Sequence, residues 1–526
     1  MPFYIVQGGD TLKKMTTAGT LSSLLLPDTV TVNSAKRLRG AALGNTVVLV
    51  NSPSENLSVD TYDTVRPLAL RPPGTKVTVG TAAGGTLTGD YTVKETYILR
   101  NPNGEIVAES DFGPVSSEVS PSSQYVTVVP TISLQDVRGS LARKLYRTTT
   151  GGSVYFPWFE ADGNAALTFR DDLSDAGLSL IAAPTDLGMP PKFSNIVEWK
   201  ERLWGVPEND FDTLWQSAAG KGYAWPLSRT IVIPPKRDDD VGITGFIRRK
   251  DELGVGRRSK LFKIVGTSNT NFSRQTVTEQ VGLWATDSSV TIHDIGYFLG
   301  NPLGVYTWGP GGVTNITDEK VKAWFATDTY FNRSEFDQAV GFYDPLQHAY
   351  VLLLAGAGGT TLNRWIQYNI STGTWWGPHK TGEFTPTGGT TIDNASGVRV
   401  PCMFASNGLL YVPQTTKTDG SSAAIDYELI TNWLSGGTPD IFKTWLDPSV
   451  VTKIQASGTL SVTPRVGKLS ASEGTTRSHD MTLGHQRLSI MGDGEFLQLR
   501  LQQATNAVDV VLYGVDVPFY ENGRRS

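Results

Sequence analysis

Short apolar runs separated by polar turns extend along most of the 526-residue chain. Helix-like spacing is confined to brief stretches such as 318–325, because Gly or Pro interrupts nearly every longer window. Thr, Ser and Val recur in short runs, and the 55 glycines favour tight turns between strands. The pattern therefore predicts an all-β protein assembled from hairpins.

Hairpins of one kind recur through the middle of the chain, and a further hairpin lies upstream at Gly44-Asn45. The turns of the five central hairpins lie about 52 residues apart on average, close to the ~50-residue period of kelch-type blades. This repeat predicts a β-propeller of about five to seven blades, with an ordinary β-sandwich as the alternative. The central hairpins span 196–206, 243–265, 281–292, 340–354 and 403–412.

Tryptophan usage supports the repeat. Ten of the 13 tryptophans lie between Trp199 and Trp376. Two of the hairpins are followed in like places by Tyr306-Thr-Trp-Gly-Pro310 and Thr374-Trp-Trp-Gly-Pro378. Large flat side chains suit the wedge between sheets that pack around an axis, so we expect the tryptophans to fill that space.

Strand spacing and linker composition divide the chain into four predicted regions. After a Pro-rich segment at 71–74, strands at 91–99, 124–130, 143–147 and 153–159 fit an immunoglobulin- or fibronectin-like sandwich inserted into the propeller. Near the C-terminus we predict paired strands at 495–502 and 508–515. The predicted regions are 1–78 (N-terminal propeller strands), 79–185 (inserted sandwich), 186–425 (main propeller) and 426–526 (C-terminal β-region, closing the propeller or contacting neighbours).

Charge and cysteine content narrow the class of protein. The 46 basic and 51 acidic residues give a net charge of -5, which argues against a chain that coats nucleic acid as a whole. The single cysteine, Cys402, excludes an intrachain disulfide and fits folding in a reducing compartment. No signal-peptide pattern is present, and the longest nearly apolar stretch, 349–358, has half of the ~20 residues that span a bilayer, so we expect no membrane anchor.

The chain resembles the β-propeller structural proteins of tailed bacteriophages, including tail nozzle and packaged-DNA stabilisation proteins of short-tailed phages. The resemblance rests on several short passages that occur in the same order as in those proteins. The early Gly-Asn hairpin and Pro-rich crossover come first. The passages that follow are Gly89-Asp-Tyr-Thr-Val93, Leu145-Tyr-Arg-Thr148, Thr168-Phe-Arg-Asp171, Arg202-Leu-Trp-Gly205, Leu261-Phe-Lys-Ile264, Asp440-Ile-Phe-Lys443 and a closing β-unit with Arg524.

This resemblance implies a virion structural protein of the tail, a nozzle, hub or head-tail connector part without enzymatic activity or cofactor. It implies a homo-oligomeric ring, expected to be a hexamer, that contacts other tail or connector proteins and helps to retain or guide genomic DNA during ejection. Assembly would take place in the cytoplasm of the bacterial host.

One local charge anomaly stands out in this acidic chain. The charged loop expected within the hairpin at 243–265 holds seven basic and two acidic residues between Arg248 and Lys263. We consider it a candidate for non-specific contact with DNA phosphates or with a neighbouring subunit, and a solvated loop as the alternative. The candidate residues are Arg248, Arg249, Lys250, Arg257, Arg258 and Lys260.

Sequence signals for chemistry are weak. The five histidines are scattered, and neither a metal-ligand spacing, a Walker loop nor a nucleophile elbow is found. Asp238-Asp-Asp240 could supply paired carboxylates but is more typical of a charged surface loop. Two alternatives stay open: a host-surface glycan-binding propeller, which predicts several exposed tryptophans, and a tail-associated polysaccharide depolymerase.

Overall fold

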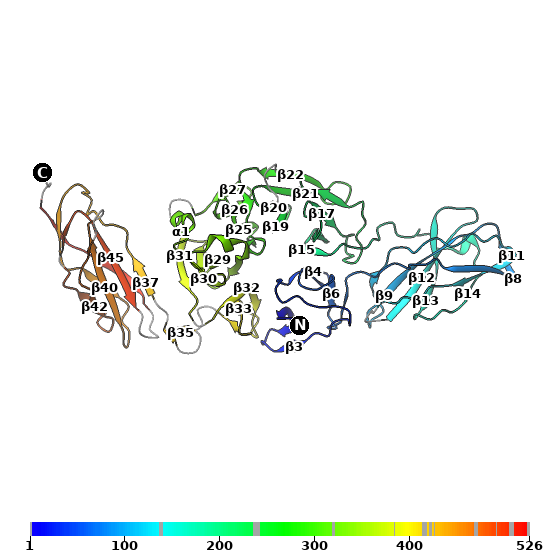
Figure 1. The fold of residues 1–526 in the computed structure, drawn as a ribbon, viewed down its shortest axis with the longest axis horizontal. Helices are drawn as coiled ribbons and strands as arrows, with labels where there is room; N and C mark the ends of the chain where they lie inside the picture. Colours follow the sequence, from blue (N-terminus) through cyan, green and yellow to red (C-terminus); the bar gives the residue numbers. More distant parts are fainter. Residues whose placement is uncertain are drawn as a thin grey trace. The chain divides into compact units, whose positions relative to one another are not determined.

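The computed structural model describes most of the chain in the ranges given at the end of this paragraph (Figure 1). The chain divides into two compact units. The first comprises 1–360, 366–377 and 390–401, and the second comprises 361–365, 378–389 and 402–526. The described residues are 3–135, 140–234, 242–317, 321–382, 384–412, 418–419, 423–424, 427–467, 472–490, 492–503 and 510–522.

The protein is all-β and is built of many small antiparallel sheets, as the sequence predicts. Seven sheets of three to five strands succeed one another in the described residues outside the insertion and the C-terminal region, an arrangement consistent with a propeller-like fold. Their strands are β1 (Phe3–Gly8), β2 (Thr11–Thr16), β3 (Leu21–Ser23); β4 (Arg39–Leu43), β5 (Thr46–Val50), β6 (Leu57–Asp60), β7 (Val65–Pro67); β15 (Phe193–Trp199), β16 (Arg202–Pro207), β17 (Thr213–Gln216), β18 (Thr230–Val232); β19 (Ile243–Arg248), β20 (Leu253–Arg257), β21 (Leu261–Val265), β22 (Ser273–Thr278); β23 (Gly282–Leu283), β24 (Val290–Ile292), β25 (Ile295–Asn301), β26 (Gly304–Gly309), β27 (Gly312–Asn315); β28 (Val340–Asp344), β29 (Ala349–Ala355), β30 (Leu362–Asn369), β31 (Thr374–Lys380); and β32 (Pro386–Asp393), β33 (Arg399–Ala405), β34 (Leu410–Tyr411).

In the described part of the chain, short helices interrupt the strands at four places. The stretch 318–325 was expected to be helical, and its described part begins the helix α1. None of the described helices is long and apolar enough to cross a membrane. The helices are α1 (Lys322–Ala326) and the 3-10 helices η1 (Asp175–Gly177), η2 (Thr286–Ser288) and η3 (Arg333–Gln338).

The first strands of six sheets, together with η2 and β24 of the remaining sheet, form a closed circuit of contacts. From β4 the circuit passes to β15 and β19, which Figure 1 labels, and then to η2 and β24 and to β28. The hydroxyl of Thr391 in β32 donates to the carbonyl of Tyr343 in β28 at 2.5 Å, and the amide of Asp393 donates to the hydroxyl of Tyr4 in β1 at 2.6 Å. The amide of Leu38, just before β4, donates to Gln7 of β1 at 2.8 Å and completes the circuit.

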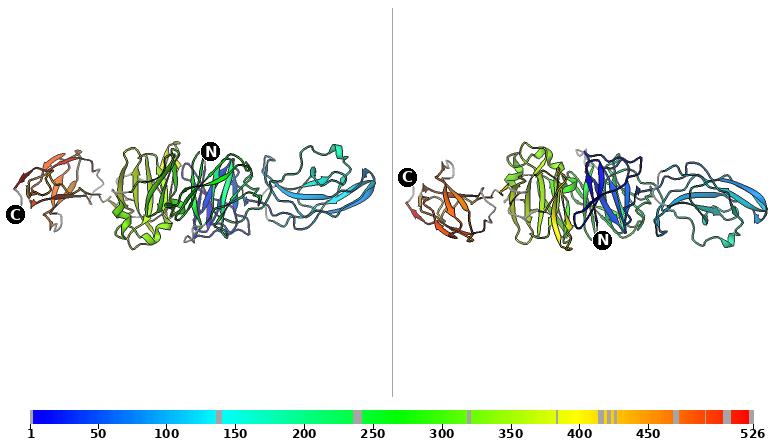
Figure 2. Two further views of the ribbon diagram at one scale, coloured as in Figure 1. Left: turned by 90° about the horizontal axis from the view of Figure 1, so that it is seen from above. Right: turned by 90° about the horizontal axis from the view of Figure 1, so that it is seen from below.

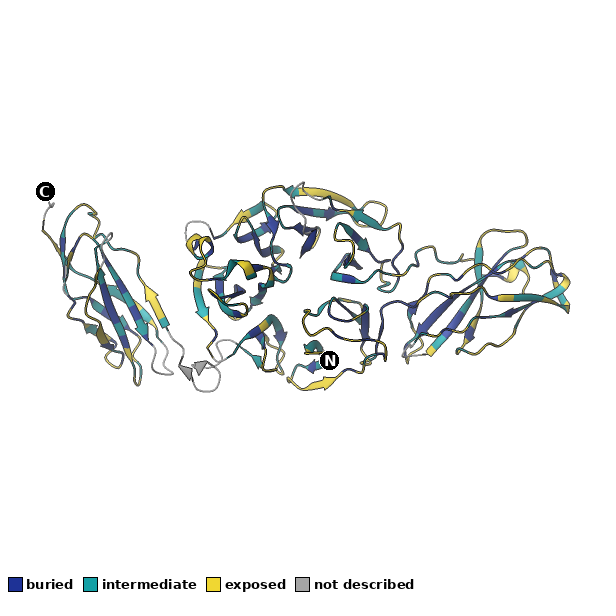
Figure 3. Cartoon of the chain, viewed as in Figure 1, coloured by how far each residue is buried: buried dark blue, intermediate teal, exposed yellow. Residues whose placement is uncertain are grey.

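Large aromatic side chains pack between neighbouring sheets, as expected. The strands of these sheets are largely buried (Figure 3). Trp199 and Trp204 are buried, and their ring centroids lie 5.7 and 5.0 Å from that of Phe272. The indole of Trp199 donates to the carbonyl of Arg249 in the next sheet at 3.0 Å. Apolar packing between sheets therefore comes with hydrogen bonds that fix how one sheet meets the next.

Two of the predicted central hairpins are wrong. The expected charged loop between β19 and β21 contains β20, in which buried Leu253 and Val255 alternate with glycines. The predicted hairpin at 281–292 does not form, because β23 and β24 both pair with β25 and η2 lies between them. The other three central hairpins and the upstream hairpin β4–β5 are confirmed.

The residues between β7 and β15 form two facing sheets, which lie as two layers (Figure 2). Val93, Val126 and Leu145 are fully buried in their common core. The turn at 148–152 joins β12 to β13, as predicted. The sheets have the strand orders β10-β9-β12-β13 and β14-β11-β8, with β8 (Thr78–Thr88), β9 (Val93–Arg100), β10 (Ile106–Glu109), β11 (Ser122–Val129), β12 (Ser140–Thr148), β13 (Tyr155–Asp162) and β14 (Phe169–Asp171).

An apolar seam joins these two sheets to the segment that follows them. Tyr223, from the connection between β17 and β18, packs against Tyr97 and Leu99 of β9. Tyr223 also packs with Phe112 against Leu187. Burial raises the pKa of the Tyr223 hydroxyl, and the carboxylates of nearby acidic residues add to the effect.

A buried carboxyl group in the insertion is sensitive to pH near neutrality. Burial raises the pKa of Glu95 to about 7, against the opposing hydrogen bond from the amide of Thr131. Because the folded pKa lies above the unfolded value, the stability from this group is complete below pH ~4.5 and is lost as the pH rises to about 7. The loss amounts to about 3 kcal/mol.

We therefore expect Glu95→Gln, whose amide oxygen can accept the same bonds, to stabilise the insertion at pH 8 relative to the parent and to lose this advantage at pH 5. Urea unfolding at both pH values measures the difference. Gln124→Ala, on β11, changes no titratable group and is the control, which should show no such pH dependence. Equal differences at pH 5 and pH 8 for Glu95→Gln would mean that folding does not raise the pKa of Glu95.

The C-terminal region is a separate set of sheets around one core, which includes Trp445, Leu460 and Leu499. The predicted pairing of 495–502 with 508–515 is wrong, because β45 pairs with β37 and β40, whereas β46 pairs with β39. Arg524 lies outside the described residues. The strands are β37 (Tyr427–Ile430), β38 (Lys443–Trp445), β39 (Ser449–Thr452), β40 (Thr459–Val466), β41 (Ser472–Glu473), β42 (Arg477–Asp480), β43 (His485–Arg487), β44 (Gly492–Gly494), β45 (Leu497–Gln503), β46 (Leu512–Asp516) and β47 (Phe519–Glu521), preceded by the two-stranded β35 (Thr418–Asp419) and β36 (Ala423–Ala424).

Candidate functional site

The candidate basic residues do not form one patch. Strand β20 separates them, so 248–250 lie at the β19–β20 turn and 257–260 lie at the β20–β21 turn. In an antiparallel sheet these turns are at opposite ends, and the five residues of β20 separate them by roughly 16 Å. Each cluster is therefore considered by itself.

At the β19–β20 turn, one arginine is buried and two cations are exposed. Arg249 is 6% exposed, and its Nε donates to the carbonyl of Asp294 at 2.9 Å. Its guanidinium also pairs with Glu252 and lies 4.9 Å from the ring centroid of Trp308. The Arg248 side chain is 59% exposed and pairs with Glu198 at 2.6 Å, while Lys250 is exposed.

At the β20–β21 turn, all three cations have internal partners. Arg257 is 1% exposed, and its Nη1 lies 2.5 Å from the carboxylate of Asp212 in the preceding sheet. The guanidinium of Arg258 lies 4.4 Å from the ring centroid of Trp284 in the following sheet. Lys260 pairs with Glu279 at 3.2 Å.

These contacts show that most of the basic segment joins neighbouring sheets. A guanidinium that is 1% or 6% exposed cannot reach a phosphate or another subunit without unfolding its surroundings. The hypothesis of DNA or subunit contact is thereby narrowed to the exposed Arg248 and Lys250.

A second basic cluster, which sequence reasoning missed, lies where the first strands of three sheets begin. Arg39 of β4 pairs with Asp287 of η2 through its Nε at 2.9 Å and its Nη2 at 3.1 Å. Its Nη1 donates to the carbonyl of Ser194 in β15 at 3.0 Å. Arg37 also donates to Asp287, at 3.2 Å.

A second carboxylate extends this cluster. Glu208, directly after β16, pairs with Lys36 at 2.7 Å and with Lys192 at 2.9 Å. Lys36 precedes Arg37 in sequence, and Lys192 lies two residues before Ser194, so the two groups adjoin. We call these residues the Arg37 network; its members are Lys36, Arg37, Arg39, Lys192, Glu208 and Asp287.

The Arg37 network connects sheets that are not neighbours. The sheets that begin with β15 and β19 come between the sheets that hold Arg39 and Asp287. The contact therefore adds a direct link between the β4 sheet and the sheet that contains η2. The helix η2, which interrupts the predicted hairpin at 281–292, carries Asp287 to this place.

The electrostatics of the Arg37 network are dominated by its cations. Burial pushes the pKa of Asp287 upward, but attraction by Arg39 and Arg37 outweighs it and leaves the pKa below its usual value. The pKa of Glu208 is likewise lowered by Lys36 and Lys192 in spite of burial. Four cations face two carboxylates, so the network carries an excess charge of about +2 at neutral pH.

The run Lys36-Arg37-Leu-Arg39 before the upstream hairpin is the only sequence signal for this cluster. Its acidic partner lies 248 residues away from Arg39 along the chain, and no local pattern indicates that contact.

A histidine pair lies at neighbouring turns of the circuit. The ring centroids of His293 and His348 are 5.2 Å apart, and the Tyr343 hydroxyl lies 2.8 Å from Nδ1 of His348. Among the described residues, no three His, Cys, Asp or Glu side chains come together as metal ligands. Asp238, Asp239 and Asp240 lie outside the described residues.

The tryptophans bear on the glycan-binding alternative, which predicts several exposed rings. All 13 tryptophans are described, and Trp376, at 57% exposed, is the one that is largely open to solvent. Five are fully buried, namely Trp199, Trp204, Trp225, Trp308 and Trp445.

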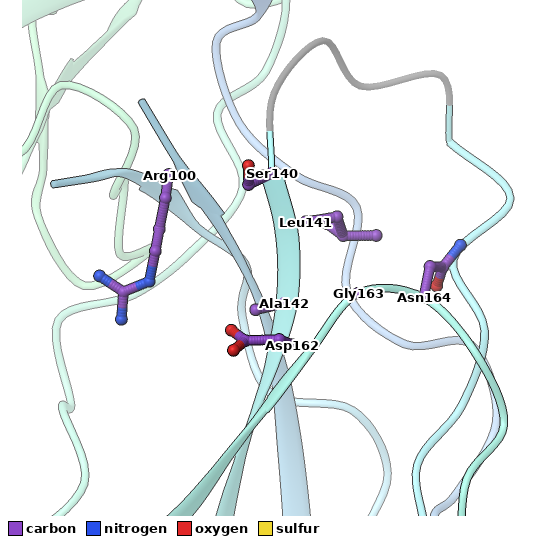
Figure 4. Close-up of a pocket in the computed structure, with 7 residues that line it drawn as sticks. All are labelled: Arg100, Ser140, Leu141, Ala142, Asp162, Gly163 and Asn164. Atoms are coloured by element: carbon purple, nitrogen blue, oxygen red, sulfur yellow. The ribbon is translucent and has the colours of Figure 1, made fainter. Parts of the chain in front are cut away.

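A pocket of about 490 Å³ lies at one end of the insertion, lined by residues of β9 and β12 and by Asp162, Gly163 and Asn164 (Figure 4). Its cation, Arg100, lies 2.5 Å from the Glu160 carboxylate and donates to the carbonyl of Gly104 at 2.6 Å. This pocket therefore presents polar groups that are already engaged by the insertion itself.

No protein-family model and no curated protein matches the chain. Among solved structures, PorZ of the type-IX secretion system of Porphyromonas gingivalis is 8% identical, with a TM-score of 0.27 over 98% of this chain and 80% of that chain. An exo-β-1,3-galactanase from Phanerochaete chrysosporium is 9% identical, with a TM-score of 0.18 over 91% of this chain and 95% of that chain. A Trypanosoma rangeli sialidase is 10% identical, with a TM-score of 0.16 over 98% and 83%. Likenesses this weak assign no activity.

Proposed function

We propose that the protein is a structural component of a bacteriophage tail, a nozzle, hub or connector part that works by mechanical support. In this proposal the circuit of sheets is a seven-bladed β-propeller. The two facing sheets between β7 and β15 are an immunoglobulin- or fibronectin-like insertion, and the C-terminal sheets form a third module.

The apolar seam at Tyr223 is the observation that supports this function most directly. Tyr223 packs against Tyr97 and Leu99 on one side and shares contacts with Phe112 on the other. A linker alone would leave the insertion free to move, whereas a packed seam holds it at a fixed angle to the blade that carries it. A structural component that sets the positions of neighbouring subunits needs an insertion held in a fixed orientation.

The order of the modules also supports the proposal. The upstream hairpin, the insertion, the β15–β16 hairpin and the closing C-terminal region follow one another as in the phage proteins that the sequence resembles. Copies that assemble as a ring would multiply weak contacts through avidity, and the ring would hold or guide DNA within the virion.

Light scattering and electron microscopy of the purified full chain test the proposal, with a ring of copies as the expected result. We expect Tyr223→Ala to lower ring formation severalfold, because the insertion loses its fixed orientation, while the chain loses only about 1–2 kcal/mol of stability. Tyr513→Ala, at a ring that is 68% exposed, is the matched control and should assemble normally.

A chain that stays monomeric at all concentrations and binds or degrades host capsule glycans would contradict the proposal and favour the glycan-directed alternatives. Immunogold labelling of virions provides the second arm, since a tail component must label the tail axis.

A further inference from the structure

The Arg37 network has more positive charge than its own carboxylates neutralise. Four cations share Asp287 and Glu208, and both carboxylates are already bound to two cations each. Arg39 pairs with both carboxylate oxygens of Asp287 and also donates to the carbonyl of Ser194. The excess charge therefore resides mainly on the other three cations.

Arg37 is the member best placed to bind a ligand. Its side chain is 32% exposed, and its contact with Asp287 runs through Nη1 alone. A guanidinium has five N–H donors in a planar fork, so further donors remain on a group that Asp287 holds in place. Lys36 is 44% exposed and Lys192 is 34% exposed, so both lie within reach of solvent.

We propose that the Arg37 network binds phosphate groups, with Arg37 as the direct ligand and Lys36 and Lys192 as supporting cations. A guanidinium matches the spacing of two phosphate oxygens, and charge-assisted bonds of this kind are the strong ones. Asp287 and Ser194 fix the arginines before the ligand arrives, which lowers the entropic cost of binding. The cluster joins the starts of β4 and β15 to η2 and is separate from the basic segment that the sequence suggests.

The phosphate has two sources with the same chemistry, free inorganic phosphate and the backbone of DNA. The DNA source deepens the proposed tail function and rests on it, since a part that guides DNA meets that backbone. The site itself depends only on the charges described above.

The test is binding of inorganic phosphate by calorimetry and of a short duplex DNA by fluorescence anisotropy, both at low salt and with the full chain. We expect Arg37→Gln to weaken binding by about tenfold and Lys36→Gln by about threefold. Glu208→Gln removes a negative charge and should strengthen binding by about threefold, a reversal of sign that a merely structural role would not produce.

Arg170→Gln and Arg399→Gln are the matched controls, because each removes the charge of an exposed arginine that belongs neither to the Arg37 network nor to the basic segment. If the duplex binds and the variants change its affinity in the order given above, the DNA backbone is the ligand. If inorganic phosphate binds and the duplex does not, the ligand is the free anion. The proposal is overturned if neither probe binds, or if the controls weaken binding as much as Arg37→Gln. Light scattering on the same samples reports ring formation separately, so that failure of the phosphate site is distinguished from failure of the tail function.

Discussion

Arg147→Met lowers the free energy of unfolding of the inserted sheets by about 3–5 kcal/mol, the largest effect that we expect from a single substitution in this protein. Arg147 of β12 and Asp171 of β14 lie in the two facing sheets, and their side chains are fully buried at an Nη1–Oδ2 distance of 3.1 Å. The guanidinium also donates to the carbonyl of Leu173 at 2.9 Å and stacks 4.7 Å from the ring centroid of Tyr91.

The cost arises mainly from the partner that remains. Burial already raises the pKa of Asp171, and Arg147 is the chief group that opposes this shift. Without the arginine, the carboxyl group must take up a proton or stay charged in an apolar setting, and either change destabilises the folded state. Arg147→Met combined with Asp171→Leu removes both charges and should recover most of the loss.

Hydrogen exchange measured by mass spectrometry locates the effect, since amides in β9 and β12 should lose protection while those of β15–β34 keep theirs. Lys144→Met is the control on the same strand, because its 3.7 Å contact with the partly exposed Glu160 contributes less than ~1 kcal/mol. If the double variant is as unstable as Arg147→Met, then the loss comes from shape and packing, and the charge argument is wrong.

The hairpin repeat could be predicted because each hairpin is local, with apolar strands of period two and a turn that contains Gly, Asn or Asp. The strand β20 could not be predicted from the sequence, because two of the five residues in Leu253-Gly-Val-Gly-Arg257 are glycines, which have a low propensity for strands. The structure explains the glycines: a Cβ on Gly254 would lie 2.6 Å from the Trp308 ring, and one on Gly256 would lie 2.4 Å from Leu283. Neighbouring sheets approach so closely here that only glycine fits.

The same limit applies to the candidate site. Composition identifies a basic segment, but it does not tell whether a cation faces solvent or an acidic partner in another sheet. Arg249 and Arg257 have partners in sheets other than their own, and Arg39 has one that is 248 residues distant. Contacts of this kind depend on how the sheets close upon one another, and that closure is a property of the whole chain.

The substitution Arg257→Met tests this reinterpretation of the basic segment. We expect it to lower the free energy of unfolding by about 1.5–3 kcal/mol, because the carbonyl of Ile233 and the 46% exposed carboxylate of Asp212, which receive its Nη1 at 3.1 and 2.5 Å, lose a charged donor. Urea unfolding of the full chain measures the loss. Arg248→Met, at a side chain that is 59% exposed, should cost less than ~1 kcal/mol and provides the matched control.

The comparison of Arg257→Met with Arg248→Met shows how a loss of ring assembly should be interpreted. A variant that lacks Arg257 would assemble poorly because the β19–β22 sheet no longer holds its neighbour, whether or not this surface contacts a partner. Only Arg248 and Lys250 can report a surface role, since both are exposed and lie outside the buried seams. Reduced ring assembly in Arg248→Gln with Lys250→Gln, at unchanged stability, would therefore support a contact role for this turn. Unchanged stability in Arg257→Met would instead show that the ion pair of the buried Arg257 with Asp212 does not hold the sheets together.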